Sequence, residues 1–343
     1  MNSEQLHYSP SCCYYPTTIL MVDDNKDLLA DLSFGLMSGA PQYKSHYSTN
    51  PHEIMDILTR QGNTIESFIK NHVSVTEEDM DLAKAIVNID IPSIHHVIYK
   101  KSPLRFNEYI VLIVDYAMPD MNGLELCKKI RRELHLPIKI IMLTGEADQT
   151  TAIKAFNDKL IDRFLVKGSE DYMQKLMTYI HELHEEYFNE MSNLIIESSR
   201  AHQPALLQKE PAFVELFNQI INQYQAVEFY LLEEPGSFLF LDARKNAIRL
   251  IVKTEEDMQT SYEIAADERD TPKEKLDALK NRKKLVFFRD QKSHLQPAKQ
   301  WLLLEATPLK AQKTYYYAIA KGTEHAPLET KNLVSYYEFL NGQ

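Results

Sequence analysis

Three carboxylates, a hydroxyl and an amine lie directly after short apolar runs of this chain. These residues are Asp23, Asp24, Asp115, Thr144 and Lys167. Clustered carboxylates repel one another unless a cation joins them, and Mg²⁺ takes hard oxygen ligands while it keeps several waters. A carboxylate can also accept a phosphoryl group as an aspartyl phosphate. If the fold brings them together, these residue types predict a site for a divalent cation and a phosphoryl group.

Each side chain has a predicted role in such a site. Asp115 is the candidate nucleophile. The metal and Lys167 would neutralise charge on the equatorial phosphoryl oxygens, and Thr144 would hydrogen-bond one of these oxygens. This chemistry requires all of these groups at one place, so the elements that carry them must converge.

The apolar runs predict the strands that position these residues. The runs cover residues 18–22, 110–114, 138–143 and 164–166. Continuous apolar runs of this length are typical of parallel strands that are covered by helices on both faces. Functional groups in such sheets gather at the carboxyl ends of the strands. We therefore predict an α/β fold with a doubly wound sheet whose carboxyl edge carries the site.

The segment DYAMPDMNG, residues 115–123, resembles the phosphoacceptor loop of the receiver domain of bacterial two-component response regulators. The Asp23-Asp24 pair, Thr144-Gly145 and Lys167 complete the family's pattern in the correct order. The resemblance covers residue 17 to about residue 183. It implies a CheY-like, flavodoxin-like sheet of about five parallel strands in the order 2-1-3-4-5.

The resemblance also implies a function and a set of site residues. Asp115 would be phosphorylated by a sensor histidine kinase or a phosphotransfer protein, and the cofactor would be Mg²⁺. The implied metal ligands are Asp23, Asp24, Asp115 and the backbone carbonyl of Ala117. Thr144 and the aromatic Phe164 fall at the switch positions, so that phosphorylation would promote homodimerisation or change the docking of the second domain.

Two features depart from the family pattern. Gly168 stands after Lys167 where the family usually has proline, so the following loop is predicted to be looser. Residues 62–107 form an insertion that is longer than most connections. Within it, a helix start signal at residues 74–78 and the apolar positions 80–87 predict inserted helices. The insertion is either a packed structural addition or a partner-binding face, and the sequence does not place Glu77 and Glu78 relative to the site.

The last helix of the receiver is predicted to be extended. Apolar residues at helical spacing run from Met173 to Ile195. A helix of this length is typical of a connector between domains or between two copies of the chain. His181 and His184 lie on it three residues apart, and without a third ligand we interpret them as part of a solvated helix face; His95 and His96 are interpreted in the same way.

The chain divides into an irregular extension (1–16), the receiver (17–197), a linker (198–204) and a C-terminal domain (205–343). In the C-terminal domain we predict one helix, then strands, then helices and further strands: 213–221, 227–232, 237–241, 247–252, 255–266, 273–283, 285–288, 301–304 and 314–319. Strands joined by short turns indicate an antiparallel sheet and an α+β domain. This half is similar to an uncharacterised output module found with receivers, and the inserted receiver with its long last helix is similar to some quorum-sensing response regulators.

Composition excludes several classes of protein. With a net charge of -11 and a pI near 5.6, a nucleic-acid surface is not expected to dominate. Three cysteines give no disulfide framework and suit the cytoplasm. No apolar run is long enough for a membrane helix. We expect a signalling protein rather than an enzyme.

Three alternatives to the phosphorylation switch remain open. The chain could be a phosphorylation-independent adaptor that retains the site residues. It could also regulate transcription through a weak nucleic-acid contact. A phosphatase with an aspartate nucleophile is disfavoured because Ala117 stands two residues after Asp115, where such enzymes place an acid.

Overall fold

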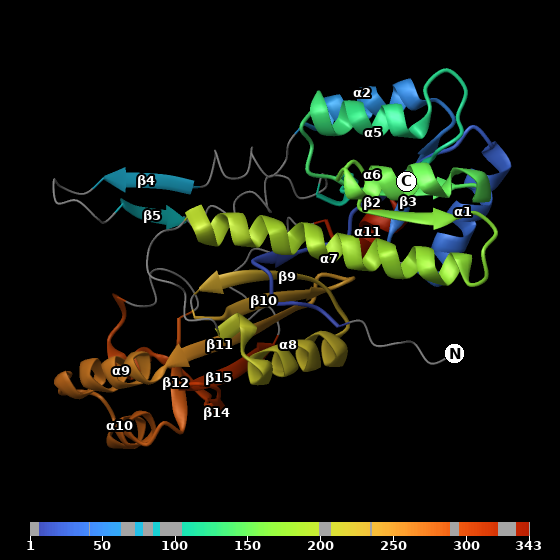
Figure 1. The fold of residues 1–343 in the computed structure, drawn as a ribbon. Coiled ribbons are helices and arrows are strands. Elements are labelled where there is room, and N and C mark those ends of the chain that lie inside the picture. The colour runs from blue at the N-terminus through green and yellow to red at the C-terminus, as the bar shows by residue number, and fades with distance from the viewer. Residues whose placement is uncertain are drawn as a thin grey trace.

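The computed structural model describes residues 7–40, 42–62, 73–77, 85–89, 105–198, 207–233, 235–288, 295–321 and 334–342. A parallel sheet and an antiparallel sheet lie on either side of one long helix (Figure 1). Within the described part of the chain, none of the helices combines the length and the apolar character needed to cross a membrane.

The first half of the chain forms the predicted five-stranded parallel sheet. Its strands, in spatial order, are β3 (Lys44–Ser48), β2 (Thr18–Val22), β6 (Val111–Asp115), β7 (Lys139–Thr144) and β8 (Arg163–Val166). Numbered along the receiver alone, this order is 2-1-3-4-5, so the predicted fold class is confirmed. Strands β2, β6 and β7 are buried along their whole length, as expected for strands covered on both faces.

Helices cover both faces of this sheet. They are α1 (Lys26–Gly39), α2 (Pro51–Gln61), α5 (Gly123–Arg132), α6 (Gln149–Asn157) and α7 (Tyr172–Ser198). Side chains of α1 and α7 share one core with the sheet, and side chains of α2, α5 and α6 form the core of the opposite face. The N-terminus of α1, α2 and α5 is capped in each case by an asparagine: Asn25, Asn50 and Asn122.

The described part of the insertion contains strands instead of the predicted helix. Strands β4 (Val73–Glu77) and β5 (Ala85–Ile89) pair in antiparallel register. The prediction of a helix across this segment is therefore wrong, since alternating and β-branched residues such as Val73, Val75 and Ile86 favour extended backbone. The rest of residues 63–104, including His95 and His96, lies outside the described residues.

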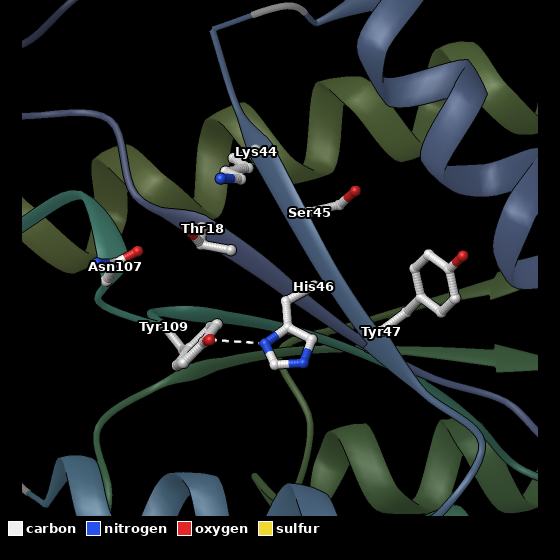
Figure 2. Close-up of a pocket in the computed structure, with 7 residues that line it drawn as sticks. All are labelled: Thr18, Lys44, Ser45, His46, Tyr47, Asn107 and Tyr109. Carbon is white, nitrogen blue, oxygen red and sulfur yellow. Dashed lines mark hydrogen bonds between the residues drawn. The ribbon is translucent and has the colours of Figure 1, made fainter. Parts of the chain in front are cut away.

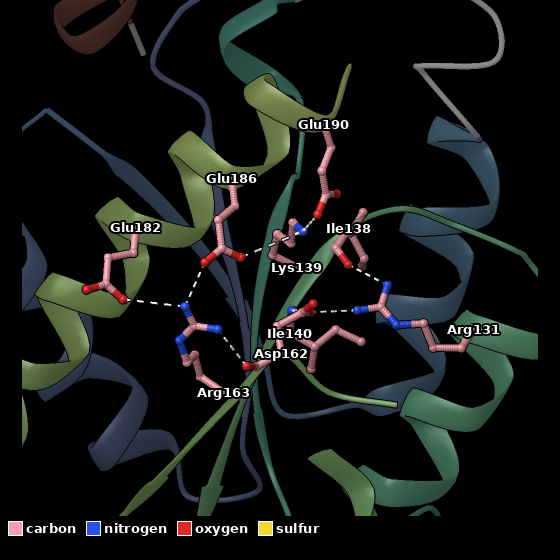
Figure 3. A network of polar contacts seen from close by, with 9 residues as sticks. All are labelled: Arg131, Ile138, Lys139, Ile140, Asp162, Arg163, Glu182, Glu186 and Glu190. Atoms are coloured by element: carbon pink, nitrogen blue, oxygen red, sulfur yellow. Dashed lines mark hydrogen bonds and ion pairs between the residues drawn. The ribbon is translucent and has the colours of Figure 1, made fainter. Parts of the chain in front are cut away.

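A row of ion pairs connects α7 to the parallel sheet (Figure 3). Lys139 Nζ lies 2.7 Å from Glu190 and 3.9 Å from Glu186. Arg163 pairs with Glu186 at 2.7 Å and with Glu182 at 3.5 Å. The three glutamates are four residues apart and so lie on one face of α7. They fix the helix over the first residues of β7 and β8.

His181 and His184 both depart from the solvated helix face that we predicted. His181 is half-buried, with its Nδ1 3.4 Å from the Tyr43 hydroxyl and its ring against Tyr8, and His184 departs further. Its side chain is fully buried, its Nε2 lies 3.1 Å from the Thr17 hydroxyl, and its ring contacts Tyr14, Tyr43 and Phe188. The prediction was wrong because the far side of α7 is covered by a second domain, which helical spacing alone does not reveal.

The C-terminal half is built on a six-stranded antiparallel sheet, in agreement with the predicted α+β class. In spatial order its strands are β1 (Cys13–Tyr14), β9 (Ala226–Glu233), β10 (Ser237–Asp242), β11 (Ala247–Thr254), β15 (Thr314–Lys321) and β14 (Thr307–Lys310). Helix α8 (Pro211–Tyr224) packs on one face through aromatic residues that include Phe213 and Phe217. Residues 13–14 thus pair with β9, whereas an irregular extension was predicted for 1–16.

The other face of this sheet carries a smaller subdomain. It consists of α9 (Glu255–Asp267), α10 (Lys273–Lys280) and the strand pair β12 (Lys284–Phe287) and β13 (Leu302–Glu305). The short helix α11 (Tyr336–Asn341) follows near the C-terminus. Strand β14 and helix α11 were not predicted. Most of the proposed linker, residues 199–204, lies outside the described residues.

The two halves share buried contacts. Ile19 of β2, Phe188 of α7 and Phe229 of β9 belong to one continuous hydrophobic core. Arg105, at the end of the insertion, forms a buried two-point ion pair with Glu228 of β9, with N–O distances of 2.9 and 3.0 Å. The receiver and the C-terminal sheet are therefore packed together and not merely tethered.

Candidate functional site

The structure brings the predicted site residues to the carboxyl edge of the parallel sheet. Ligand oxygens of Asp23, Asp24 and Asp115 all lie within 4.8 Å of one another. Asp23 and Asp115 are buried, whereas Asp24 is exposed. Three hard oxygen donors at this spacing suit a divalent cation such as Mg²⁺.

Lys167 joins the two buried carboxylates. Its ammonium lies 2.7 Å from Asp23 and 2.7 Å from Asp115. Burial raises the pKa of Asp115, and the nearby Asp23 charge adds to this rise, while the hydrogen bond from Lys167 opposes it. Burial alone would lower the pKa of Lys167, but its bonds to both carboxylates raise that pKa overall. The pocket thus holds a charged lysine against clustered acids.

The local backbone positions the carboxylates of the site. Asp23 accepts a hydrogen bond from the backbone N–H of Asn25, and the side chain of Asn25 caps α1. A Cβ on Gly123 would collide with the backbone carbonyl oxygen of Asp115. Only glycine therefore lets α5 begin directly beside the backbone of Asp115.

The remaining predicted residues surround the carboxylates. The fully buried Thr144 ends β7, and its hydroxyl donates to the Gly145 carbonyl at 3.1 Å. Ala117 donates its backbone N–H to the Asp115 carboxylate. Phe164 on β8 is half-buried and packs against the core beneath α2, α5 and α6. The predicted roles in switching and in metal binding stay predictions.

Gly168 has a backbone conformation that proline cannot adopt. Its φ is +73°, whereas the proline ring fixes φ near −65°. The N–H of Ser169 donates to the Val166 carbonyl across this turn at 3.3 Å. The departure from the family pattern thus accompanies a different turn between Lys167 and α7.

Tyr172 is a site neighbour that the sequence did not reveal. It is the first residue of α7, and its buried hydroxyl has no hydrogen-bond partner among the residues that the structure describes. Burial raises its pKa, and the charges of Asp23 and Asp115 raise the pKa further. A tyrosine five positions after Lys167 was the available signal, but its orientation depends on the turn at Gly168.

A separate cavity lies along β3, the edge strand of the parallel sheet. This cavity of about 270 Å³ is lined by Thr18, Lys44, Ser45, His46, Tyr47, Asn107 and Tyr109 (Figure 2). His46 Nδ1 and the Tyr109 hydroxyl are 2.7 Å apart and satisfy each other. The cavity thus lies along the edge strand β3, beside the first residue of β2 and the segment just before β6, and none of the site residues Asp23, Asp24, Asp115, Thr144 and Lys167 lines it.

Comparison with known proteins matches this fold and site. A family model for the response regulator receiver domain matches residues 100–180. The chemotaxis protein CheY homolog of Campylobacter jejuni subsp. jejuni is 35% identical over 127 residues, which cover 35% of this chain and 90% of that protein. The transcriptional regulatory protein SpaR of Bacillus subtilis is 28% identical over 108 residues, which cover 30% of this chain and 44% of SpaR.

One solved structure matches nearly the whole chain. The Legionella pneumophila response regulator LqsR is 31% identical and superimposes with a TM-score of 0.77, covering 98% of this chain and 97% of that one. The chain therefore belongs to the response regulators of two-component signalling, and its first half is a CheY-like receiver domain. Receiver domains in general interact with histidine kinases or phosphotransfer proteins.

Proposed function

We propose that this protein is a phosphorylation switch that accepts a phosphoryl group on Asp115. The observation that carries the proposal is the pocket in which Lys167 lies 2.7 Å from both Asp23 and Asp115. A buried carboxylate with an ammonium beside it provides a nucleophile and a fixed positive charge for the phosphoryl oxygens. The donor is a phosphohistidine on a sensor kinase or a phosphotransfer protein.

The transfer step needs little covalent chemistry from the protein. An oxygen of Asp115 forms a bond to phosphorus while the bond from phosphorus to the histidine nitrogen breaks, and the imidazole retains the electron pair. Lys167 stabilises charge on the phosphoryl oxygens, and Thr144 turns its hydroxyl from the Gly145 carbonyl to one of them. We propose a stoichiometric acceptor rather than an enzyme, because Ala117 cannot supply a general acid.

The donor set fits Mg²⁺ as the cofactor. Asp23, Asp24 and Asp115 would hold the ion, with the Ala117 carbonyl as a further ligand. When bound, Mg²⁺ offsets negative charge at the phosphoryl group. Carboxylate oxygens without nitrogen or sulfur donors favour such a hard cation.

The proposed output is a change in dimerisation or in the packing of the C-terminal domain. Thr144 and Phe164 lie on β7 and β8. The first residues of these strands form ion pairs with glutamates of α7 (Figure 3). A rearrangement of these strands would act on α7, which packs against both sheets. A second copy of the chain is the proposed partner in the phosphorylated state.

Acetyl phosphate with Mg²⁺ tests the proposal without knowledge of the kinase. Wild type should gain the mass of one phosphoryl group, while the Asp115→Asn variant should gain none. Light scattering on the same samples should show the mass double in wild type only if the output is dimerisation. An equal adduct on both proteins, or none on wild type after rapid quenching, would contradict the phosphorylation switch and favour an adaptor that works without phosphate.

A further inference from the structure

Two buried hydroxyl groups at the turn after Lys167 have no hydrogen-bond partner within the described part of the chain. These are Ser169 Oγ and Tyr172 Oη. About nine-tenths or more of buried polar groups in proteins are hydrogen-bonded, so an orphaned one calls for an explanation. Two such hydroxyl groups lie within four residues of each other, in the turn that follows the site residue Lys167. This turn is therefore a place where a hydrogen-bond partner could bind.

Tyr172, the first residue of α7 and five positions after Lys167, is the orphan whose hydroxyl lies within range of the charges of Asp23 and Asp115. Its aromatic ring packs against the main hydrophobic core, which fixes the side chain. The charges that act most on its hydroxyl are those of Asp23 and Asp115. The hydroxyl stays protonated at neutral pH because burial and these negative charges both raise its pKa, so it is available as a hydrogen-bond donor.

The acidic groups near Tyr172 already have other donors. Lys167 binds one oxygen of Asp23 and one of Asp115. The other Asp23 oxygen accepts from the Asn25 N–H, and the Ala117 N–H donates to Asp115. A phosphoryl group on Asp115 would add three strong acceptor oxygens at this place.

We propose that Tyr172 is a further ligand of the phosphorylated site, and that its hydroxyl donates a hydrogen bond to an oxygen of the phosphoryl group on Asp115. The inference rests on the proposed phosphorylation of Asp115. The orphaned hydroxyl costs stability in the unphosphorylated protein and gains its partner on phosphorylation. Tyr172 thus shifts the equilibrium toward the phosphorylated protein and lengthens the lifetime of the phosphorylated state.

Thermal unfolding of Tyr172→Phe tests this inference. The substitution keeps the aromatic ring and removes only the hydroxyl. Without ligand, the melting temperature should rise by about 2–4 °C, because an unsatisfied buried group is removed. With Mg²⁺ and beryllofluoride, which mimics a phosphoryl group on aspartate, the affinity should fall roughly tenfold relative to wild type.

Tyr179→Phe is the matched control. Tyr179 lies two turns further along α7 with its ring near the Arg163 guanidinium, so its variant should leave both readouts unchanged. Equal beryllofluoride affinity in wild type and Tyr172→Phe would overturn the role of Tyr172 alone. No stabilisation of wild type by Mg²⁺ and beryllofluoride would overturn the phosphoryl site itself.

Discussion

Lys167 does in this structure what a metal ion does in a carboxylate cluster. It lies between Asp23 and Asp115 and offsets part of their mutual repulsion. An added cation would share these oxygens with the ammonium, and a phosphoryl group would offer the ammonium new acceptors. The three residues are thus arranged for exchange of partners and not only for stability.

Gly168→Ala is predicted to destabilise the protein by about 1–2 kcal/mol. The reason is the φ of +73°, because a Cβ is strained in the left-handed region. Gly168→Pro should cost more, since the ring cannot reach this φ at all. Chemical denaturation measures both values.

Gly145→Ala is the control for these glycine variants. Gly145 borders the same site but has φ −76°, and a Cβ there meets no atom closer than 3.8 Å. Its alanine variant should be neutral or slightly more stable. A tolerated proline at Gly168 would contradict the described turn.

Sequence reasoning predicted the acidic pocket but not its full surroundings. Asp23, Asp115 and Lys167 could be placed because each follows an apolar strand, and the carboxyl ends of parallel strands meet at one edge. Tyr172 could not be placed, since its hydroxyl is orphaned only as a result of how the turn and the helix pack. Whether a polar group has a partner is a property of the folded chain.

Helix α7 is the element on which both halves pack. On one side, glutamates of α7 form ion pairs with β7 and β8. On another side, the His184 ring packs in the aromatic core with Tyr14 and Tyr43. Burial, and then the neighbouring His181, hold the pKa of His184 well below its usual value. This buried imidazole is therefore neutral, and none of the described residues forms a hydrogen bond with its Nδ1.

Stability should become dependent on pH through His184. Because its folded-state pKa is lowered, its contribution is present above the unfolded pKa of about 6.5 and is lost as the pH falls below that value. The slope approaches about 1.4 kcal/mol per pH unit for one proton. The stability advantage of wild type over His184→Gln should therefore shrink from pH 7 to pH 5 in denaturation experiments.

The adjacent Glu185 provides a control of opposite sign. Burial raises its pKa to about 7, although the Ser9 N–H bond opposes the rise. Its contribution is present below the unfolded pKa near 4.3 and is lost as the pH rises through 7. As the pH rises from 5 to 7, wild type should become less stable relative to Glu185→Gln. Over the same range, it should become more stable relative to His184→Gln. Parallel pH profiles for all three proteins would contradict the described burial.

Among the elements, those with strong periodicity were predictable and the insertion was not. The long α7 follows from apolar spacing over many turns, and the structure describes it as continuous helix from Tyr172 to Ser198, across the apolar positions from which it was predicted. The segment around Val73 and Ile86 carries both a capping signal and β-branched residues, and pairing of β4 with β5 decides between them. Such pairing depends on contacts that a local pattern does not contain.

At the scale of the whole molecule, the N-terminal strand and the Arg105–Glu228 pair join the halves. Strand β1 precedes the receiver in sequence yet pairs with β9 of the C-terminal sheet. The Tyr336 hydroxyl of α11 reaches back to the Gln42 carbonyl at 2.6 Å. These contacts join residues that are between 123 and 294 positions apart, so they could not be predicted from the sequence of either domain alone.

Arg105→Ala is predicted to destabilise the protein by about 3–5 kcal/mol. Of the hydrogen bonds to the fully buried Glu228 carboxylate within the described residues, the substitution leaves the one from the Tyr230 hydroxyl, at 2.6 Å. Denaturant titration measures the change. The control is Glu305→Ala, which removes an exposed pair with Lys284 and should cost less than about 1 kcal/mol. A loss at Arg105 as small as the control's would show that the junction contributes little to folding.

We predict that a phosphoryl group at Asp115 acts on the C-terminal sheet through α7. Hydrogen–deuterium exchange with Mg²⁺ and beryllofluoride measures this effect when wild type is compared with Asp115→Asn. In wild type, protection should change at the acidic pocket and also along α7 and β9, while the variant should show neither change. Changes confined to the pocket, or identical changes in both proteins, would contradict transmission from Asp115 through α7.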